Sequence, residues 1–156
     1  MLSAKVEKEV RKYLKGASPE DRVYIGCDSR RFKRGKQGEW WASYDTAIVI
    51  HKNNKNGCKV IVDTELARDY DQKRDRPQMR MMNECYKAVE AYQQLEDILE
   101  DREVEVHLDL NEDERHGSSC AKSAAVGYAK GVTGRTVRIK PYAFAASYAA
   151  DRQIRI

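Results

Sequence analysis

The chain has 156 residues, enough to fold as a single domain that buries roughly 70 % of the surface its unfolded form exposes. Charged residues make up 35 % of it, and no apolar run approaches the roughly 18 residues of a membrane span, so we expect no membrane association. The formal net charge of +4 permits nucleic-acid binding without requiring it.

The N-terminal half of the chain predicts a helix followed by three strands. Residues 3–16 have the charged, amphipathic pattern of a helix rather than of a secretory signal, with Ser3 as a candidate N-cap. Apolar runs bounded by turn residues predict strands at 22–28, 40–52 and 58–65. Three consecutive strands with short connections should form an antiparallel meander.

The C-terminal half predicts alternating helices and strands. Pro77 fits the first turn of a long helix that ends near Asp101, because apolar residues recur at helical spacing: Met81, Cys85, Ala88, Val89, Tyr92, Leu95 and Leu99. Apolar and polar residues alternate over 103–110, which predicts a strand parallel to an earlier one, since it follows a long helix. Further elements are predicted at 118–131 (helix), 135–141 (strand) and 142–153 (helix). The order αβββαβαβα predicts an α/β fold built on a mixed sheet.

Four cysteines are spread along the chain: Cys27, Cys58, Cys85 and Cys120. No CxxC spacing favours a zinc site or a disulfide framework, so a zinc protein has little support. We therefore expect free thiols and a protein of the reducing cytoplasm.

Basic residues cluster in the stretch RRFKRGK, residues 30–36, which surrounds Phe32 with five cations: Arg30, Arg31, Lys33, Arg34 and Lys36. Taken alone, such a cluster is typical of a solvated hairpin loop. In a nucleic-acid-binding protein it would contact phosphates. We predict the second role, together with Trp40 or Trp41 and with Lys140 elsewhere in the chain.

Four carboxylates are candidates for one metal site. In open α/β sheets, sites form where neighbouring strands send their connections to opposite sides, here between the first and fourth strands. Asp28 ends the first predicted strand, Asp109 nears the end of the fourth, and Glu84 projects from the apolar stripe of the long helix. Asp151 lies on the alanine-rich last helix. Singly, Asp28 or Asp109 could be a turn residue, Glu84 could pair with Arg80 or Lys87 on its own helix, and Asp151 could bond Arg152 or a terminal backbone group. Together the four acids would repel one another unless Mg²⁺ or Mn²⁺ neutralised them.

Four stretches carry a family resemblance: YIGCDSR, MRMMNECYKAVEAY, VHLDLN and GYAKGVTGRTVRIKPYAFAASYAADR. Through them the chain resembles the ribonuclease H-like superfamily, and more closely its YkuK-type branch, over residues 22–152. The resemblance implies a five-stranded mixed sheet of order 3-2-1-4-5 flanked by helices. Residues 1–16 would be an additional N-terminal helix within a single domain spanning 1–156.

The same resemblance implies a divalent-metal-dependent nuclease that acts on RNA, RNA–DNA hybrid or structured DNA. Two Mg²⁺ or Mn²⁺ ions would be held by the four acids: Asp28, Glu84, Asp109 and Asp151. The segment KPYAFA before the last helix departs from the family pattern, because ribonuclease H proper often has a histidine there. A catalytically weak or inactive nucleic-acid-binding module is the alternative, since one fold hosts many functions.

Overall fold

Five strands form one mixed sheet in the computed structural model, which describes residues 1–52, 57–70, 78–110, 122–140 and 142–145. The elements in chain order are α1 (Ala4–Lys15), β1 (Arg22–Arg34), β2 (Glu39–His51), β3 (Cys58–Arg68), α2 (Gln78–Leu99), β4 (Val104–Leu108), α3 (Lys122–Thr133) and β5 (Thr136–Arg138). The sheet order is β3-β2-β1-β4-β5. The first three strands are antiparallel, and β4 and β5 extend the sheet parallel to β1. This confirms the predicted fold class and strand order.

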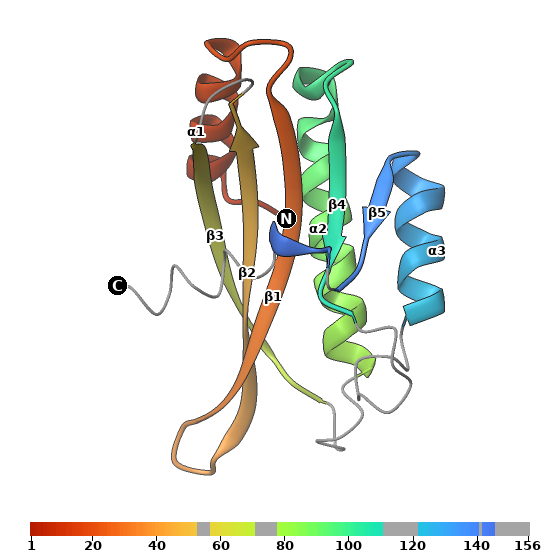
Figure 1. Cartoon of the computed structure of the whole chain (residues 1–156). Helices are drawn as coiled ribbons and strands as arrows, with labels where there is room; N and C mark the ends of the chain where they lie inside the picture. The colour runs from red at the N-terminus through yellow and green to blue at the C-terminus, as the bar shows by residue number, and fades with distance from the viewer. Residues whose placement is uncertain (53–56, 71–77, 111–121, 141, 146–156) are drawn as a thin grey trace.

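The three helices lie on one face of the sheet (Figure 1). α1 begins as predicted, because the Ser3 hydroxyl accepts the N–H of Val6 at 3.3 Å and caps the helix. The apolar stripe predicted for α2 is buried along its whole length: Met81, Cys85, Ala88, Val89, Tyr92, Leu95 and Leu99. This continuous apolar contact with the sheet fixes α2 against β1 and β4, so a polar side chain on the same stripe has a defined position.

The opposite face of the sheet carries a smaller cluster around His107, which is fully buried. Its ring lies 5.2 Å from the ring of Tyr24 and 4.6 Å from that of Phe144, measured between centroids. Nδ1 accepts the N–H of Ala145 at 3.1 Å, so the proton is on Nε2, which faces Glu105 at 3.2 Å. Burial lowers the pKa of His107, although Glu105 opposes the change. Strand alternation alone would leave this face polar and wet, but residues 142–145 cover it.

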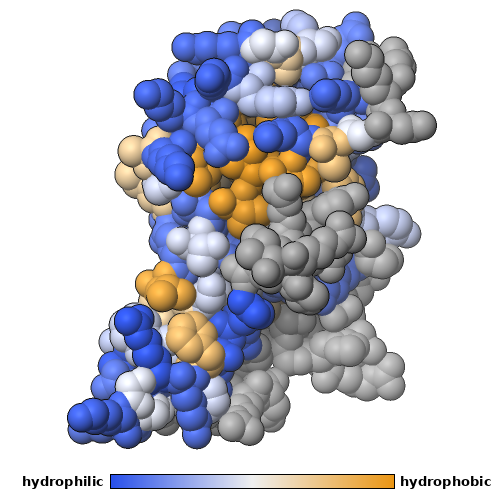
Figure 2. Space-filling model, turned by 90° about the vertical axis from the view of Figure 1, so that its left-hand side faces the viewer, coloured by the Kyte–Doolittle hydropathy of each residue, from blue (hydrophilic) through white to orange (hydrophobic). Residues whose placement is uncertain are grey.

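The β1–β2 hairpin is longer than predicted. Arg34 still pairs with Glu39, so the connection is the four-residue segment 35–38, which includes Gly35 and Gly38 at φ of 84° and 65°. The prediction of a basic loop over 30–36 is therefore wrong for its first five residues, which belong to β1. Cross-strand pairing explains the extension, because Trp40 and Trp41 lie opposite Lys33 and Phe32. The hairpin projects from the sheet and its surface is largely hydrophilic (Figures 1 and 2).

The C-terminal elements are described in part. α3 is observed at Lys122–Thr133 and β5 at Thr136–Arg138, within or close to the predicted ranges. The predicted cap Ser118 lies outside the described residues, as does Asp151 on the predicted last helix, of which only 142–145 are described. Within the described segments, no helix is both long and apolar enough to cross a membrane.

Candidate metal centre

The register of the two parallel strands brings Asp28 and Asp109 together. β1 pairs with β4 as far as Cys27, which lies opposite Leu108. Asp28 and Asp109 are the next residue on each strand, so they lie side by side where β4 ends. The sequence predicted that Asp28 also ends its strand, but β1 continues to Arg34. The two acids are neighbours because the register sets them opposite each other, and the shorter β4 places them where the pairing of the two strands ends.

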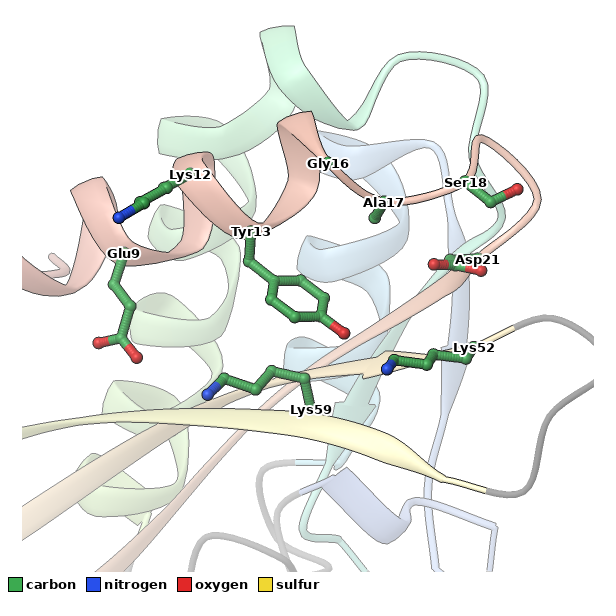
Figure 3. Close-up of a pocket in the computed structure, with 9 residues that line it drawn as sticks. All are labelled: Glu9, Lys12, Tyr13, Gly16, Ala17, Ser18, Asp21, Lys52 and Lys59. Atoms are coloured by element: carbon green, nitrogen blue, oxygen red, sulfur yellow. The ribbon is translucent and has the colours of Figure 1, made fainter.

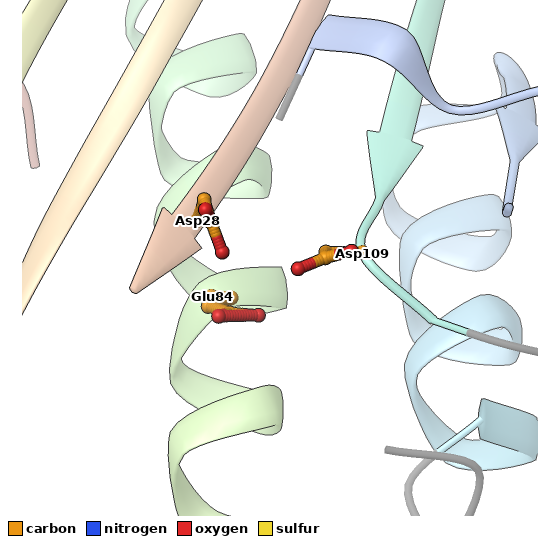
Figure 4. A group of neighbouring side chains, drawn as sticks. All are labelled: Asp28, Glu84 and Asp109. Atoms are coloured by element: carbon orange, nitrogen blue, oxygen red, sulfur yellow. The ribbon is translucent and has the colours of Figure 1, made fainter. Parts of the chain in front are cut away.

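Glu84 completes a group of three carboxylates (Figure 4). It projects from the buried stripe of α2 toward β1 and is only 3 % exposed. One ligand oxygen from each of Asp28, Glu84 and Asp109 lies within 4.8 Å of the other two. Three carboxylates with no nitrogen or sulfur donor suit a hard cation such as Mg²⁺ or Mn²⁺. Oxygens this close would need only small side-chain rotations to share one ion.

Burial and like charge raise the pKa values of Asp28 and Glu84. Burial, followed by the charge of Asp109 and a hydrogen bond to it, raises the pKa of Asp28 to about 7. Burial also raises the pKa of Glu84 well above its usual value, with the charges of both aspartates acting in the same direction. A metal-free site therefore retains protons near neutral pH. A bound dication would displace them, because it favours the ionised carboxylates.

Among the described residues, Lys140 forms a direct ion pair with the group. Its ammonium lies 2.6 Å from Asp109 Oδ1, and its N–H donates to the carbonyl of Leu110 at 2.9 Å. Partial burial alone would lower the pKa of Lys140, but the hydrogen bond and charge of Asp109, with the charges of the other two acids, raise it. We predicted Lys140 as a nucleic-acid contact; the structure places it against the acids.

Of the side chains around Glu84, the sequence offered Arg80 as a neighbour on the same helix but did not single out Ser29. The Ser29 hydroxyl donates to Glu84 Oε1 at 2.6 Å and accepts from Arg80 Nη1 at 3.3 Å. Arg80 also lies near Asp69, with 4.0 Å between its Nε and Oδ2. Lys87, a candidate partner of Glu84 by helical spacing, instead pairs with Glu65. The only signal for Ser29 is its place next to Asp28.

The hairpin cations differ in how far they are available to a ligand. Arg31 is mostly buried, pairs with Asp69 at 2.7 Å and lies 4.2 Å above the Trp40 ring. Lys33 and Arg34 are exposed. The Lys33 ammonium lies 5.0 Å from the Trp40 ring centroid, and the Arg34 guanidinium lies 5.1 Å from that of Trp41. Arg30 and Lys36 are also exposed. Four of the five predicted cations can therefore contact a ligand, whereas Arg31 has a structural role.

A groove lies beside the turn of the hairpin and the end of β3. It has a volume of about 410 Å³ and is lined by two arginines, two aromatic residues and the two carboxylates that pair with the arginines: Arg31, Arg68, Trp40, Tyr70, Glu39 and Asp69. The Arg68 guanidinium lies 5.4 Å from the Tyr70 ring centroid and pairs with Glu39 at 3.0 Å. Aromatic rings flanked by arginines suit stacked nucleobases and phosphates.

A larger cavity of about 710 Å³ lies away from the acids, at the end of α1 (Figure 3). Tyr13 points into it, together with lysines from α1 and from the β2–β3 end of the sheet: Lys12, Lys52 and Lys59. None of the three clustered acids lines it. Its size alone does not make it the chemical site, because perturbed carboxylates are gathered elsewhere.

A zinc site finds no support among the described residues. Cys27 and Cys85 are buried free thiols, and Cys58 is an exposed one. Burial raises the pKa of Cys27 and raises that of Cys85 to about 12, which disfavours the thiolate that zinc binds. In the part of the chain that the structure describes, the group of potential metal ligands contains carboxylates alone.

Comparison with known proteins gives a family match. A family model described as ribonuclease H-like matches residues 5–155. None of the curated proteins matches the chain. Among solved structures, the chain is similar to "LC9-RNase H1, a type 1 RNase H with the type 2 active-site motif", with 11 % identity and a TM-score of 0.44. That match covers 88 % of this chain and 72 % of the other.

Proposed function

The chain belongs to the ribonuclease H-like family, and from this premise we propose that it is a divalent-metal-dependent nuclease. The observation that carries the proposal is the meeting of three carboxylates from β1, α2 and the end of β4. Acids of like charge are costly to gather around a buried carboxylate such as Glu84, and binding a cation offsets that cost.

In the proposed mechanism, Asp28, Glu84 and Asp109 hold Mg²⁺ or Mn²⁺, with Asp151 as a fourth acid. Bound ions of this kind supply an activated water and stabilise the leaving oxygen in phosphodiester hydrolysis, and two of them are the common arrangement. The apolar stripe of α2 holds Glu84 against β1, and the strand register sets the two aspartates side by side. These residues therefore need little rearrangement to bind ions.

The projecting hairpin would hold the nucleic acid, whether RNA, RNA–DNA hybrid or structured DNA. Its exposed cations would contact phosphates: Arg30, Lys33, Arg34 and Lys36. The groove beside Trp40 and Tyr70 would take an unpaired base by stacking. We also propose that Lys140 turns from Asp109 to a phosphate when ions occupy the acids.

We extend the proposal to finer assignments. The protein would belong to the YkuK-type branch, with residues 22–152 as the core of a single domain and residues 1–16 as an added helix. The free thiols at Cys27, Cys58 and Cys85 support a cytoplasmic location, where disulfides are rare.

One observation favours a binding module without cleavage. The Lys140 ammonium already neutralises Asp109 at 2.6 Å, and the raised pKa values of Asp28 and Glu84 reduce the remaining negative charge. The group can therefore persist without an ion. In that case nucleic acid would bind but would not be cut with any divalent cation.

A cleavage panel distinguishes the two functions. Hybrid, single-stranded and double-stranded substrates are incubated with Mg²⁺, Mn²⁺ or EDTA. The variant Asp109→Asn should abolish metal-dependent cleavage while the protein stays folded. Its matched control is Asp63→Asn, which changes another buried acid, on β3 and two strands from β1, whose Oδ1 accepts the Ser3 N–H at 3.3 Å. Cleavage by Asp109→Asn at the wild-type rate would rule out this site, and binding without any cleavage would favour the binding module.

A further inference from the structure

The residue next to one proposed ligand is bonded to another. Ser29 directly follows Asp28 on β1 and is buried. Its hydroxyl has one hydrogen, which it donates to Glu84 Oε1 at 2.6 Å, and its oxygen accepts from Arg80 Nη1 at 3.3 Å. The direction of the Arg80 bond is fixed, because an arginine cannot accept a hydrogen bond, and the serine donates to the ionised Glu84 that would bind a cation.

The helix geometry explains why a serine fits between these side chains. Arg80 precedes Glu84 by four residues on α2, so both side chains lie on the side of the helix that faces β1. The serine hydroxyl fills the space between the guanidinium and the carboxylate. Its bond to Oε1 therefore restricts the rotation of the Glu84 carboxylate, which lies beside the two aspartates.

Arg80 lies beside a buried carboxylate, that of Asp69, which directly follows β3. The Asp69 side chain is only 2 % exposed; its Oδ2 lies 4.0 Å from Arg80 Nε and 2.7 Å from Arg31 Nε. The N–H of Asp69 donates to the Trp40 carbonyl at 3.0 Å. A continuous set of polar contacts thus joins the hairpin to the acid group.

We propose that Ser29 is a positioning residue that orients Glu84 for metal binding, with Arg80 and Asp69 fixing the serine. The inference rests on the proposed metal-dependent function and deepens it. Because Ser29 is covalently next to Asp28, its bond to Glu84 sets the separation of two ligands that come from different elements. Removing a side chain that hydrogen-bonds to a metal ligand typically lowers metal affinity by about 10- to 100-fold.

The test measures Mn²⁺ binding to metal-free protein by calorimetry, without any substrate. Ser29→Ala should weaken binding about 10- to 100-fold, whereas Ser29→Thr, which keeps the hydroxyl, should restore it to within a few-fold of wild type. The matched control is Ser43→Ala, which removes the hydroxyl of another buried serine, on β2, and should leave the affinity unchanged. A melting temperature well above the temperature of the titration shows that each variant is folded during the binding measurement.

A second readout separates positioning from a merely structural role. The cleavage rate is measured against Mn²⁺ concentration for wild type and Ser29→Ala. The half-saturating concentration should rise in the variant, while the rate at saturating Mn²⁺ falls much less. Equal Mn²⁺ affinity in the wild type and Ser29→Ala would overturn this inference and leave the metal site intact. Affinity reduced equally in Ser29→Thr would also overturn it, whereas a wild-type protein that binds no Mn²⁺ would overturn the proposed function itself.

Discussion

Replacing Asp28 with asparagine should stabilise the metal-free protein at alkaline pH more than at acid pH. Burial and the neighbouring Asp109 raise the pKa of Asp28 from 3.8 to about 7, so ionising it weakens the fold. Asparagine resembles the protonated acid. In the wild type, Asp28 Oδ1 accepts the Ser29 N–H at 2.8 Å, and the asparagine oxygen can accept the same bond. The asparagine NH₂ group can donate to Asp109 in place of the protonated Asp28 carboxyl.

The magnitude follows from the difference between the two pKa values of Asp28. Because the pKa of Asp28 is higher in the folded state, the protonated Asp28 stabilises the fold. This stabilisation is complete below pH 3.8 and is lost as the pH rises through 7. Between pH 5 and pH 8 this amounts to about 2–3 kcal/mol, at 1.36 kcal/mol for each pKa unit. Asp28→Asn does not ionise, so its free energy of unfolding relative to wild type should rise by the same amount between pH 5 and pH 8. For a chain of this size, it corresponds to a melting-temperature difference of roughly 5–10 °C.

The assay is urea unfolding in EDTA at several pH values between 5 and 8. Lys140→Met is the counterpart variant: it removes the cation beside Asp109 and should lower stability at pH 8. Saturating Mg²⁺ should reduce the difference in unfolding free energy between Asp28→Asn and wild type, because it stabilises the wild type. At a Mg²⁺ concentration 100 times the dissociation constant, this stabilisation is about 2.7 kcal/mol. An advantage of Asp28→Asn that is equal at pH 5 and pH 8 would refute the argument from burial and like charge.

Four further predictions concern other parts of the molecule. Glutamine in place of an exposed hairpin cation, at Lys33, Arg34 or Lys36, should flatten the salt dependence of nucleic-acid binding by about one counterion for each phosphate that the variant no longer neutralises. Arg31→Gln should instead lower the free energy of unfolding by about 3 kcal/mol in urea titrations, since it leaves the buried Asp69 with a weaker partner. Asp151→Asn should reduce initial rates, with Mn²⁺ restoring more activity than Mg²⁺; a wild-type rate in Mg²⁺ would reduce the catalytic set to three acids. Arg102→Met should cost about 3 kcal/mol in the same titrations without changing the activity of folded protein, because the buried guanidinium donates to carbonyls at the ends of α1 and α2.

The fold and the meeting of three carboxylates could be predicted because each depends on local pattern and simple topology. Apolar spacing fixes which side of α2 meets the sheet, and Glu84 lies on that side. A strand that follows a long helix is parallel to its partner, so Asp28 and Asp109 reach the same edge. Neither step needs knowledge of distant side chains.

The remaining features depend on contacts between segments far apart in the sequence. Charge density over 30–36 indicates a loop, yet the cross-strand pairs with Trp40 and Trp41 extend β1 through most of it. The partners of the acids, Ser29 and Lys140, are ordinary polar residues by any local measure. Their roles arise from the packing of α2 on β1 and from the segment after β5, which no periodicity encodes.

The unequal lengths of β1 and β4 link the acid site to the hairpin. β4 ends at Leu108, whereas β1 continues for seven residues beyond Cys27, its last partner on that strand. Arg34 lies six residues past Asp28, or roughly 20 Å along an extended strand. A nucleic-acid duplex has one phosphate per strand for about 3.4 Å of its axis, so that distance corresponds to about six base pairs. With a β1 that ended at Asp28, the acids could still bind ions, but the hairpin that carries the exposed cations Arg30, Lys33, Arg34 and Lys36 would be absent. The projecting hairpin is therefore the feature by which we expect this chain to hold a substrate over the acids.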